Sequence, residues 1–109
     1  MPKGMMLVQS RPASPDREDD FNAWYRDVHL PQIRAIPGFV AARRYRVHGD
    51  VLGGDGAVPE YVAVYDIEAD DITLPVQELR TRSAAGQMTH SDSLAVTPPP
   101  IVTLYELIE

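Results

Sequence analysis

The chain has 109 residues, of which 44% are hydrophobic and 24% are charged, values typical of one globular domain spanning residues 1–109. The formal net charge is −6 at pH 7, so neither nucleic acid nor an anionic membrane is an expected partner. There is no cysteine, which excludes disulfides and thiol catalysis, and no apolar run is long enough to span a membrane. We therefore expect a cytoplasmic protein.

The residue pattern predicts six elements in the order strand, helix, strand, strand, helix, strand. Apolar residues that alternate indicate the strands, and apolar residues spaced by three or four indicate the helices. The connection 49–59 is glycine-rich and long for a hairpin, so we expect it to be mobile or to form a lid. Residues 89–100 are expected to be irregular, since three consecutive prolines end that segment. The expected elements are 4–10, 17–36, 39–48, 60–68, 74–88 and 101–108.

The first expected helix contains a proline that predicts a break. Pro31 has no N–H to donate, and its ring clashes with the carbonyl of Asp27. We expect the helix to bend or to be interrupted near His29, leaving carbonyls around Asp27 without a partner. A Pro-Gly pair at 37–38 then ends the helix.

This element order predicts an α+β, ferredoxin-like βαββαβ fold, in which two helices cover one face of a four-stranded antiparallel sheet. The strands are apolar on both faces: Val62 and Val64 alternate with Tyr61 and Tyr65 on the third strand. Because the helices cover only one face, the other needs a cover as well. A second copy of the sheet is the simplest one, so we expect a homodimer.

The string F-x-x-W-Y-x-x-x-H-L-P at 21–31, followed by I-P-G-F at 36–39 and A-R-R-Y at 42–45, resembles the EthD-like branch of the dimeric α/β-barrel superfamily. The resemblance implies a ferredoxin-like subunit whose sheet pairs face to face with that of a second copy. It implies no single reaction, because the superfamily includes cofactor-free monooxygenases, polyketide cyclases, lactone isomerases and haem-handling proteins.

His29 is the first candidate catalytic residue, because an imidazole titrates near neutral pH and is a common general acid or base. Tyr25 lies one turn earlier on the same helical face, where it can orient His29 or donate a proton. Burial beside Tyr25 is expected to lower the pKa of His29 and leave a neutral base. The alternative is structural, with His29 capping loose carbonyls and Tyr25 packing in the core. The resemblance favours catalysis, since a histidine in this helix is an active-site residue in some related isomerases.

Three basic residues, Arg44, Arg46 and His48, alternate along the second expected strand and share one face. If Tyr45 faces the helices, this basic face lines the barrel. There Arg44 would stabilise a developing anion, and Arg46 and His48 would bind substrate. The alternative is solvated charge at a strand end. If Tyr45 faces the helices, Arg43 points toward them as well, and a charged residue at such a position indicates a β-bulge.

Trp24 and Tyr65 are expected to contact the substrate, although core packing is the alternative for Trp24. His90, Ser91 and Asp92 are adjacent and belong to a polar loop, so a hydrolytic triad is not expected. The three histidines show no metal-binding spacing, so no metal site is expected. We expect no cofactor, with haem ligation by His29 or His90 as the alternative.

Two functions remain open. The first is a small cofactor-free enzyme of the isomerase, cyclase, dehydratase or monooxygenase type. It would act by acid/base chemistry on an enolisable or aromatic polyketide-like substrate, or on a lactone. The second is a non-catalytic homodimer that binds a small apolar ligand or serves as a scaffold. A pocket that receives Tyr25 and His29 would favour the first.

Overall fold

The structure is a computed structural model that describes residues 2–49 and 58–109. Most of the lid expected at 49–59 lies outside the described residues. Among the described residues, no helix is both long and apolar enough to span a bilayer.

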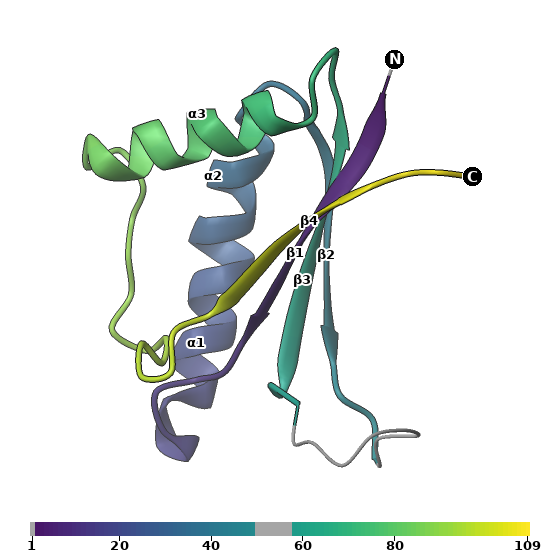
Figure 1. The fold of residues 1–109 in the computed structure, drawn as a ribbon. Helices are drawn as coiled ribbons and strands as arrows, with labels where there is room; N and C mark the ends of the chain where they lie inside the picture. The colour runs from purple at the N-terminus through teal and green to yellow at the C-terminus, as the bar shows by residue number, and fades with distance from the viewer. Residues whose placement is uncertain (1, 50–57) are drawn as a thin grey trace.

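Four strands form one antiparallel sheet in the order β2-β3-β1-β4. In the part of the chain that the structure describes, all the helices lie on one face of this sheet and leave the other face bare (Figure 1). The α+β, ferredoxin-like βαββαβ prediction is therefore confirmed. The strands are β1 (Lys3–Ser10), β2 (Phe39–Arg46), β3 (Tyr61–Glu68) and β4 (Ile101–Glu106).

The first long helix is interrupted, as Pro31 predicts. A 3-10 turn η1 (Pro15–Arg17) leads into α1 (Glu18–Trp24), then a π-helical turn η2 (Tyr25–His29), then α2 (Leu30–Arg34). The N–H of Leu30 bonds the carbonyl of Tyr25, five residues back, where an α-helix would bond four back. The turn widens because the proline ring displaces the carbonyl of Asp27. The predicted break at His29 is confirmed.

The second long helix, α3 (Thr73–Ala84), runs across the end of α2 (Figure 1). Asp71 begins it by accepting hydrogen bonds from the Thr73 N–H at 2.9 Å and the Thr73 hydroxyl at 2.7 Å. The helix ends four residues before the expected position 88, because Gly86 adopts a φ of 75° that reverses the chain. The following loop runs beside the first helix to β4.

The core lies between the sheet and the first helix. Alternate residues of β3 face inward: Tyr61, Ala63, Tyr65 and Ile67 are at most 5% exposed. Opposite them, buried side chains line one side of the helix, as the apolar periodicity predicts. They are Phe21, Tyr25, Ile33 and Ile36.

The facing predicted for β2 is wrong. A bulge between Phe39 and Ala41 shifts the register by one residue, so the residues that follow it exchange faces. Arg44 consequently faces the helices, and Tyr45 faces the bare side, 52% exposed. Arg43 also lies on the bare side, where it pairs with Asp66 through two hydrogen bonds of 2.6 and 3.2 Å. The bulge relieves the conflict that Arg43 would have met under the helices.

Candidate functional site

A pocket of about 290 Å³ opens between η2, α3, β4 and the loop after α3. Its lining combines five apolar side chains with four polar ones, a composition typical of small-molecule sites. Larger hollows of about 450 and 770 Å³ lie on the bare sheet face and beside the start of α3, but neither has a histidine in its wall. The lining residues are Met6, Val76, Leu79, Met88 and Val102, with His29, Arg80, Ser83 and His90.

His29 ends the π-turn and reaches this pocket. Its ring stacks on Trp24 with centroids 4.4 Å apart, and the Tyr25 ring meets it edge-on at 5.2 Å. Nδ1 is buried and has no hydrogen-bond partner among the described residues. Burial first, and the nearby His90 second, lower the pKa of His29 to about 4. The imidazole is therefore neutral at pH 7, and its buried Nδ1 is not engaged by any described residue.

Tyr25 orients His29 through its ring and not through its hydroxyl. The side chain is only 2% exposed, and its hydroxyl shares a 3.3 Å hydrogen bond with the Ser10 hydroxyl on β1. Burial raises the pKa of Tyr25, and the Ser10 contact offsets part of the effect. This geometry favours the orienting role over proton donation.

Arg44 lies over an aromatic cluster and does not line the pocket. Its guanidinium carbon is 4.3 Å from the Tyr25 ring centroid and 5.2 Å from that of Tyr61, and its Nη2 donates to Asn22 Oδ1 at 2.9 Å. Burial lowers the pKa of Arg44. No carboxylate lies within ion-pair distance of it in the part of the chain that the structure describes. Cation–π contacts of this kind stabilise the packing of the helix on the sheet.

The other predicted substrate-binding residues are spread through the fold. Trp24 packs against His29, and its Nε1 donates to the Thr89 carbonyl at 3.0 Å. Tyr65 is fully buried, and burial raises the pKa of its hydroxyl. Arg46 and His48 are exposed at the far end of β2. Of the seven predicted site residues, only His29 lines the pocket, with Trp24 and Tyr25 in contact with its ring.

His90 belongs to the pocket, whereas the sequence predicted a residue of a polar loop, with haem ligation as the alternative. Thr89, its neighbour, is held against the first helix by a two-way contact with Gln32. Gln32 Nε2 donates to Thr89 Oγ1 at 2.9 Å, and the Thr89 N–H donates to Gln32 Oε1 at 3.0 Å. Trp24 provides a third bond to Thr89. No local motif signals this placement, because it depends on contacts between residues 57 and 65 positions apart.

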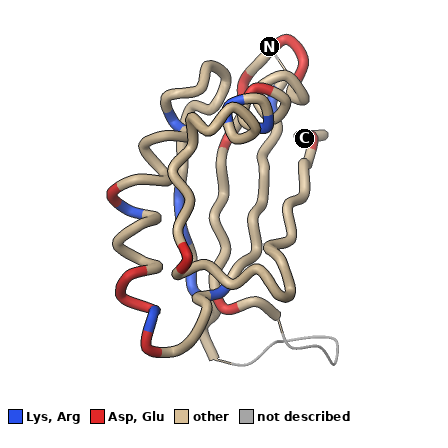
Figure 2. The backbone as a smooth tube through the Cα atoms, turned by 90° about the vertical axis from the view of Figure 1, so that its left-hand side faces the viewer, with Lys and Arg blue, Asp and Glu red and all other residues tan. Residues whose placement is uncertain are grey.

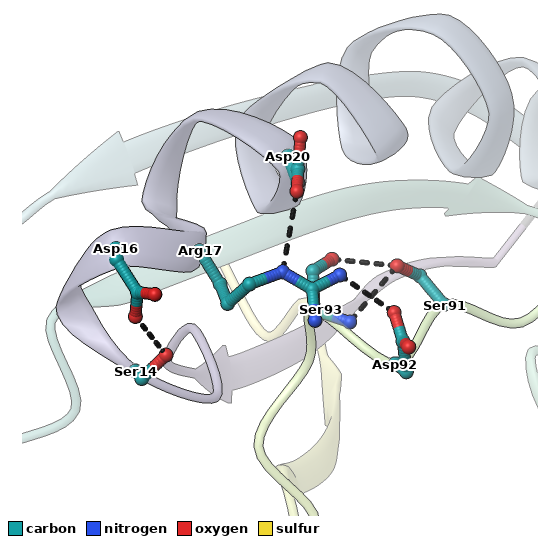
Figure 3. A network of polar contacts seen from close by, with 7 residues as sticks. All are labelled: Ser14, Asp16, Arg17, Asp20, Ser91, Asp92 and Ser93. Atoms are coloured by element: carbon teal, nitrogen blue, oxygen red, sulfur yellow. Dashed lines mark hydrogen bonds and ion pairs between the residues drawn. The ribbon is translucent and has the colours of Figure 1, made fainter.

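The rest of the loop is tied to the start of α1, as Figure 3 shows. Arg17 Nη2 bonds Asp92 at 2.6 Å, and Arg17 Nε bonds Asp20 at 3.2 Å. Ser91 Oγ accepts a hydrogen bond from the Ser93 N–H at 3.1 Å. Asp92 and Ser91 thus have structural partners away from His90, in agreement with the prediction that these residues form no triad. Within the described residues, no cluster of three His, Cys, Asp or Glu side chains suits a metal ion.

The lowered pKa of His29 predicts that the free energy of unfolding falls between about pH 6.5 and 4. In this window the unfolded chain binds a proton at His29, whereas the buried ring of the folded chain does not. The stability contribution of neutral His29 is therefore complete above about pH 6.5. It is lost as the pH falls toward 4 and amounts to about 2–3 kcal/mol. Denaturant unfolding at several pH values should show this loss in the wild type but not in His29→Gln. A His48→Gln control, at an exposed position, should keep the wild-type slope; an unchanged slope in His29→Gln would contradict the prediction.

Gln32→Ala is expected to destabilise the protein by about 1–2 kcal/mol, because it removes both side-chain bonds that hold Thr89. The NMR signals of His90 should shift as its loop loosens. Gln77 is exposed on α3 and makes no side-chain hydrogen bond within the described residues, so Gln77→Ala should change stability by less than about 0.5 kcal/mol. Equal effects of the two variants would show that the Gln32 contact does not fix the loop.

Three solved structures share this fold over nearly the whole chain. A candidate monooxygenase from Shewanella loihica PV-4 is 16% identical, with a TM-score of 0.60 over 100% of this chain and 98% of that one. An ethyl tert-butyl ether D (EthD) family protein from Bacillus halodurans C-125 is 14% identical, with a TM-score of 0.58 over 99% and 100% of the two chains. An EthD-like protein from Ralstonia eutropha JMP134 is 15% identical, with a TM-score of 0.54 over 93% and 89%.

Sequence comparison adds no closer relationship: no protein-family model matches the chain, and no curated protein matches it. At 14–16% identity, the structural likeness establishes the architecture and leaves the reaction open. The resemblance carried by the helix–strand segment is confirmed at that level: this chain has the fold of the EthD-family and EthD-like proteins.

Proposed function

We propose that this protein is a small enzyme in which His29 acts as a neutral general base on an enolisable carbonyl compound or a lactone. The observation that carries the proposal is the buried Nδ1 of His29, which has no structural partner among the described residues and belongs to a ring in the wall of a largely apolar pocket. Trp24 and Tyr25 fix the ring from two sides, which orients the base before the substrate arrives.

The proposed step is a proton transfer that needs no cofactor. The C–H bond beside the substrate carbonyl breaks, its electron pair forms an enolate, and the proton passes to the imidazole. Return of the proton to a different atom isomerises the substrate. Cyclisation and dehydration can begin with the same enolate, and so can oxygenation when molecular oxygen is the second substrate. A largely apolar pocket suits this chemistry, because an imidazole shielded from water stays neutral at neutral pH.

Hydrogen–deuterium exchange tests the proposal with simple model compounds in place of the natural substrate. A panel of enolisable ketones, keto acids and lactones in D₂O is followed by NMR with and without the protein. We expect faster exchange of the acidic C–H for at least one compound class. Saturable binding in the pocket without exchange of any bound compound would overturn the enzyme proposal and support the alternative, a non-catalytic ligand-binding protein.

We further propose that the protein is a homodimer joined through the bare sheet face, which carries apolar side chains such as Leu7, Val64 and Tyr105. The middles of β1 and β4 carry no charged residue, and Figure 2 shows these strands almost free of charge between their ends. A monomer would leave this apolar surface in water. A second copy would cover it, and the Arg43–Asp66 pair supplies polar contacts within the same face.

Light scattering at micromolar concentration is expected to give twice the mass of one chain. Val64→Glu should give a monomer, because each of the two subunits would then place a carboxylate at the centre of the interface. Asp19→Gln, at an exposed position on α1, is the control that should remain dimeric. A wild-type protein that stays monomeric would refute the dimer.

A further inference from the structure

We infer that the substrate of the His29 pocket is a small monocarboxylate, whose anionic group is bound at the mouth by Arg80 and whose apolar body contacts Met6, Val76 and Met88. The inference rests on the proposed function, since it names the substrate class of the same pocket. Three observations support it: the lining has no acidic residue, Arg80 has no carboxylate partner among the described residues, and the pocket has a buried apolar floor and an exposed polar mouth.

The lining of the pocket is cationic in a protein that is acidic overall. The chain has 16 Asp and Glu against 10 Lys and Arg, yet none of the nine lining residues is acidic. Arg80 contributes a permanent positive charge, and His29, His90 and Ser83 contribute polar groups. A cleft lined by one sign of charge attracts a ligand of the opposite sign.

Arg80 makes no ion pair or side-chain hydrogen bond in the part of the chain that the structure describes, whereas Arg82, on the same helix, bonds Glu78 at 2.9 Å. Val76, Arg80 and Ser83 are spaced by four and three residues and therefore lie on one side of α3. Of these two arginines of α3, the one that lacks a carboxylate partner is thus the one beside the pocket. A planar guanidinium can bind a carboxylate through two parallel hydrogen bonds.

Burial divides the pocket into a floor and a mouth. Met6, Val76 and Met88 are at most 8% exposed, whereas Arg80 and His90 are exposed. A ligand that satisfies both ends has a hydrophobic body and one terminal anion. A volume of about 290 Å³ limits that body to a small aryl or alkyl group. A second carboxylate would lie against the apolar floor, where it would have no partner.

A pair of isosteric probes tests this inference. NMR titration is carried out with cinnamate and with cinnamamide, which have the same shape and differ in charge. Cinnamate is expected to bind about 10–100-fold more tightly, the range of one charge-assisted interaction. Arg80→Gln should abolish this preference by lowering the affinity for cinnamate far more than the affinity for cinnamamide. Arg82→Gln, the matched control on the same helix, should retain the preference.

Equal affinity for the two probes, a preference that survives Arg80→Gln, or no saturable binding of either probe would overturn the inference. The result is separable from the proposed function. Preferential binding of cinnamate, together with no proton exchange of any panel compound that binds, would support the carboxylate site and reject the general base. Proton exchange together with equal affinities for the two probes would support the general base and reject the carboxylate site.

Discussion

Replacing His29 with glutamine is expected to slow protein-dependent proton exchange by about 10²–10⁴-fold, the usual contribution of a general base. Glutamine keeps the length and polarity of the side chain but cannot accept a proton near neutral pH. The ring lines the pocket and, within the described residues, its buried nitrogen makes no structural hydrogen bond, so the fold should survive the change. The measurement is the exchange rate of the most responsive panel compound, with circular dichroism to confirm folding.

The pH profile of the same reaction identifies the base. Because burial lowers the pKa of His29 to about 4, the rate should rise through pH 4 and then stay level toward neutrality. An ordinary histidine would produce that rise near pH 6.5. Tyr25→Phe is the control: it keeps the ring that contacts His29 and removes only the hydroxyl shared with Ser10, so less than about a tenfold loss is expected. Undiminished exchange by folded His29→Gln would refute the assignment.

Gly38→Ala is expected to destabilise the protein by about 3–4 kcal/mol, the largest effect on stability that we predict. Gly38 has a φ of 100°, a conformation that costs a residue with a side chain about 1–3 kcal/mol. A Cβ at this position would overlap Cγ of Pro75, which is buried in the first turn of α3. Relieving that overlap costs a further 1–3 kcal/mol or so, because β2 and α3 must separate.

Gly86→Ala separates the two contributions. Gly86 also has a positive φ, 75°, but among the described residues no atom lies within 4 Å of the position of an added Cβ. Only the conformational cost of about 1 kcal/mol applies. Chemical denaturation of both variants should therefore show a difference of about 2 kcal/mol or more. Equal losses would mean that Pro75 moves aside freely and that the β2–α3 contact is loosely packed.

The architecture follows from the sequence because its signals are local and repeated. The alternation of Tyr61 to Ile67 and the spacing of Phe21, Tyr25 and Ile33 each define a buried face independently of the other. Pro31 predicts the helix break through one lost hydrogen bond. The awkward facing of Arg43 indicated a β-bulge but not its position. The facing of β2 was therefore predicted wrongly, because the bulge after Phe39 reverses every later position and brings Arg43 against Asp66 on the bare side.

The site was less predictable than the fold. His29 was identifiable from its place beside a helix break. Arg44 was assigned to an anion site because it alternates with Arg46 and His48, and its aromatic partners Tyr25 and Tyr61 could not be predicted from the spacing. His90 and Arg80 reach the pocket from a loop and a helix that share no motif with the first helix. Their convergence depends on tertiary contacts such as Gln32 with Thr89, which no spacing rule describes.

The π-turn also sets the rotational phase of the helix. Each residue of an α-helix advances the side chain by about 100°, so on an unbroken helix Phe21 and Ile33 would point about 120° apart. The wide turn absorbs one residue and brings the two within about 20°, which is why both are at most 1% exposed. Deleting one residue between Tyr25 and His29 and replacing Pro31 with alanine would therefore preserve this phase in a regular helix. The π-turn thus acts as a one-residue insertion in a regular helix, which keeps both buried side chains in phase and sets the position of His29.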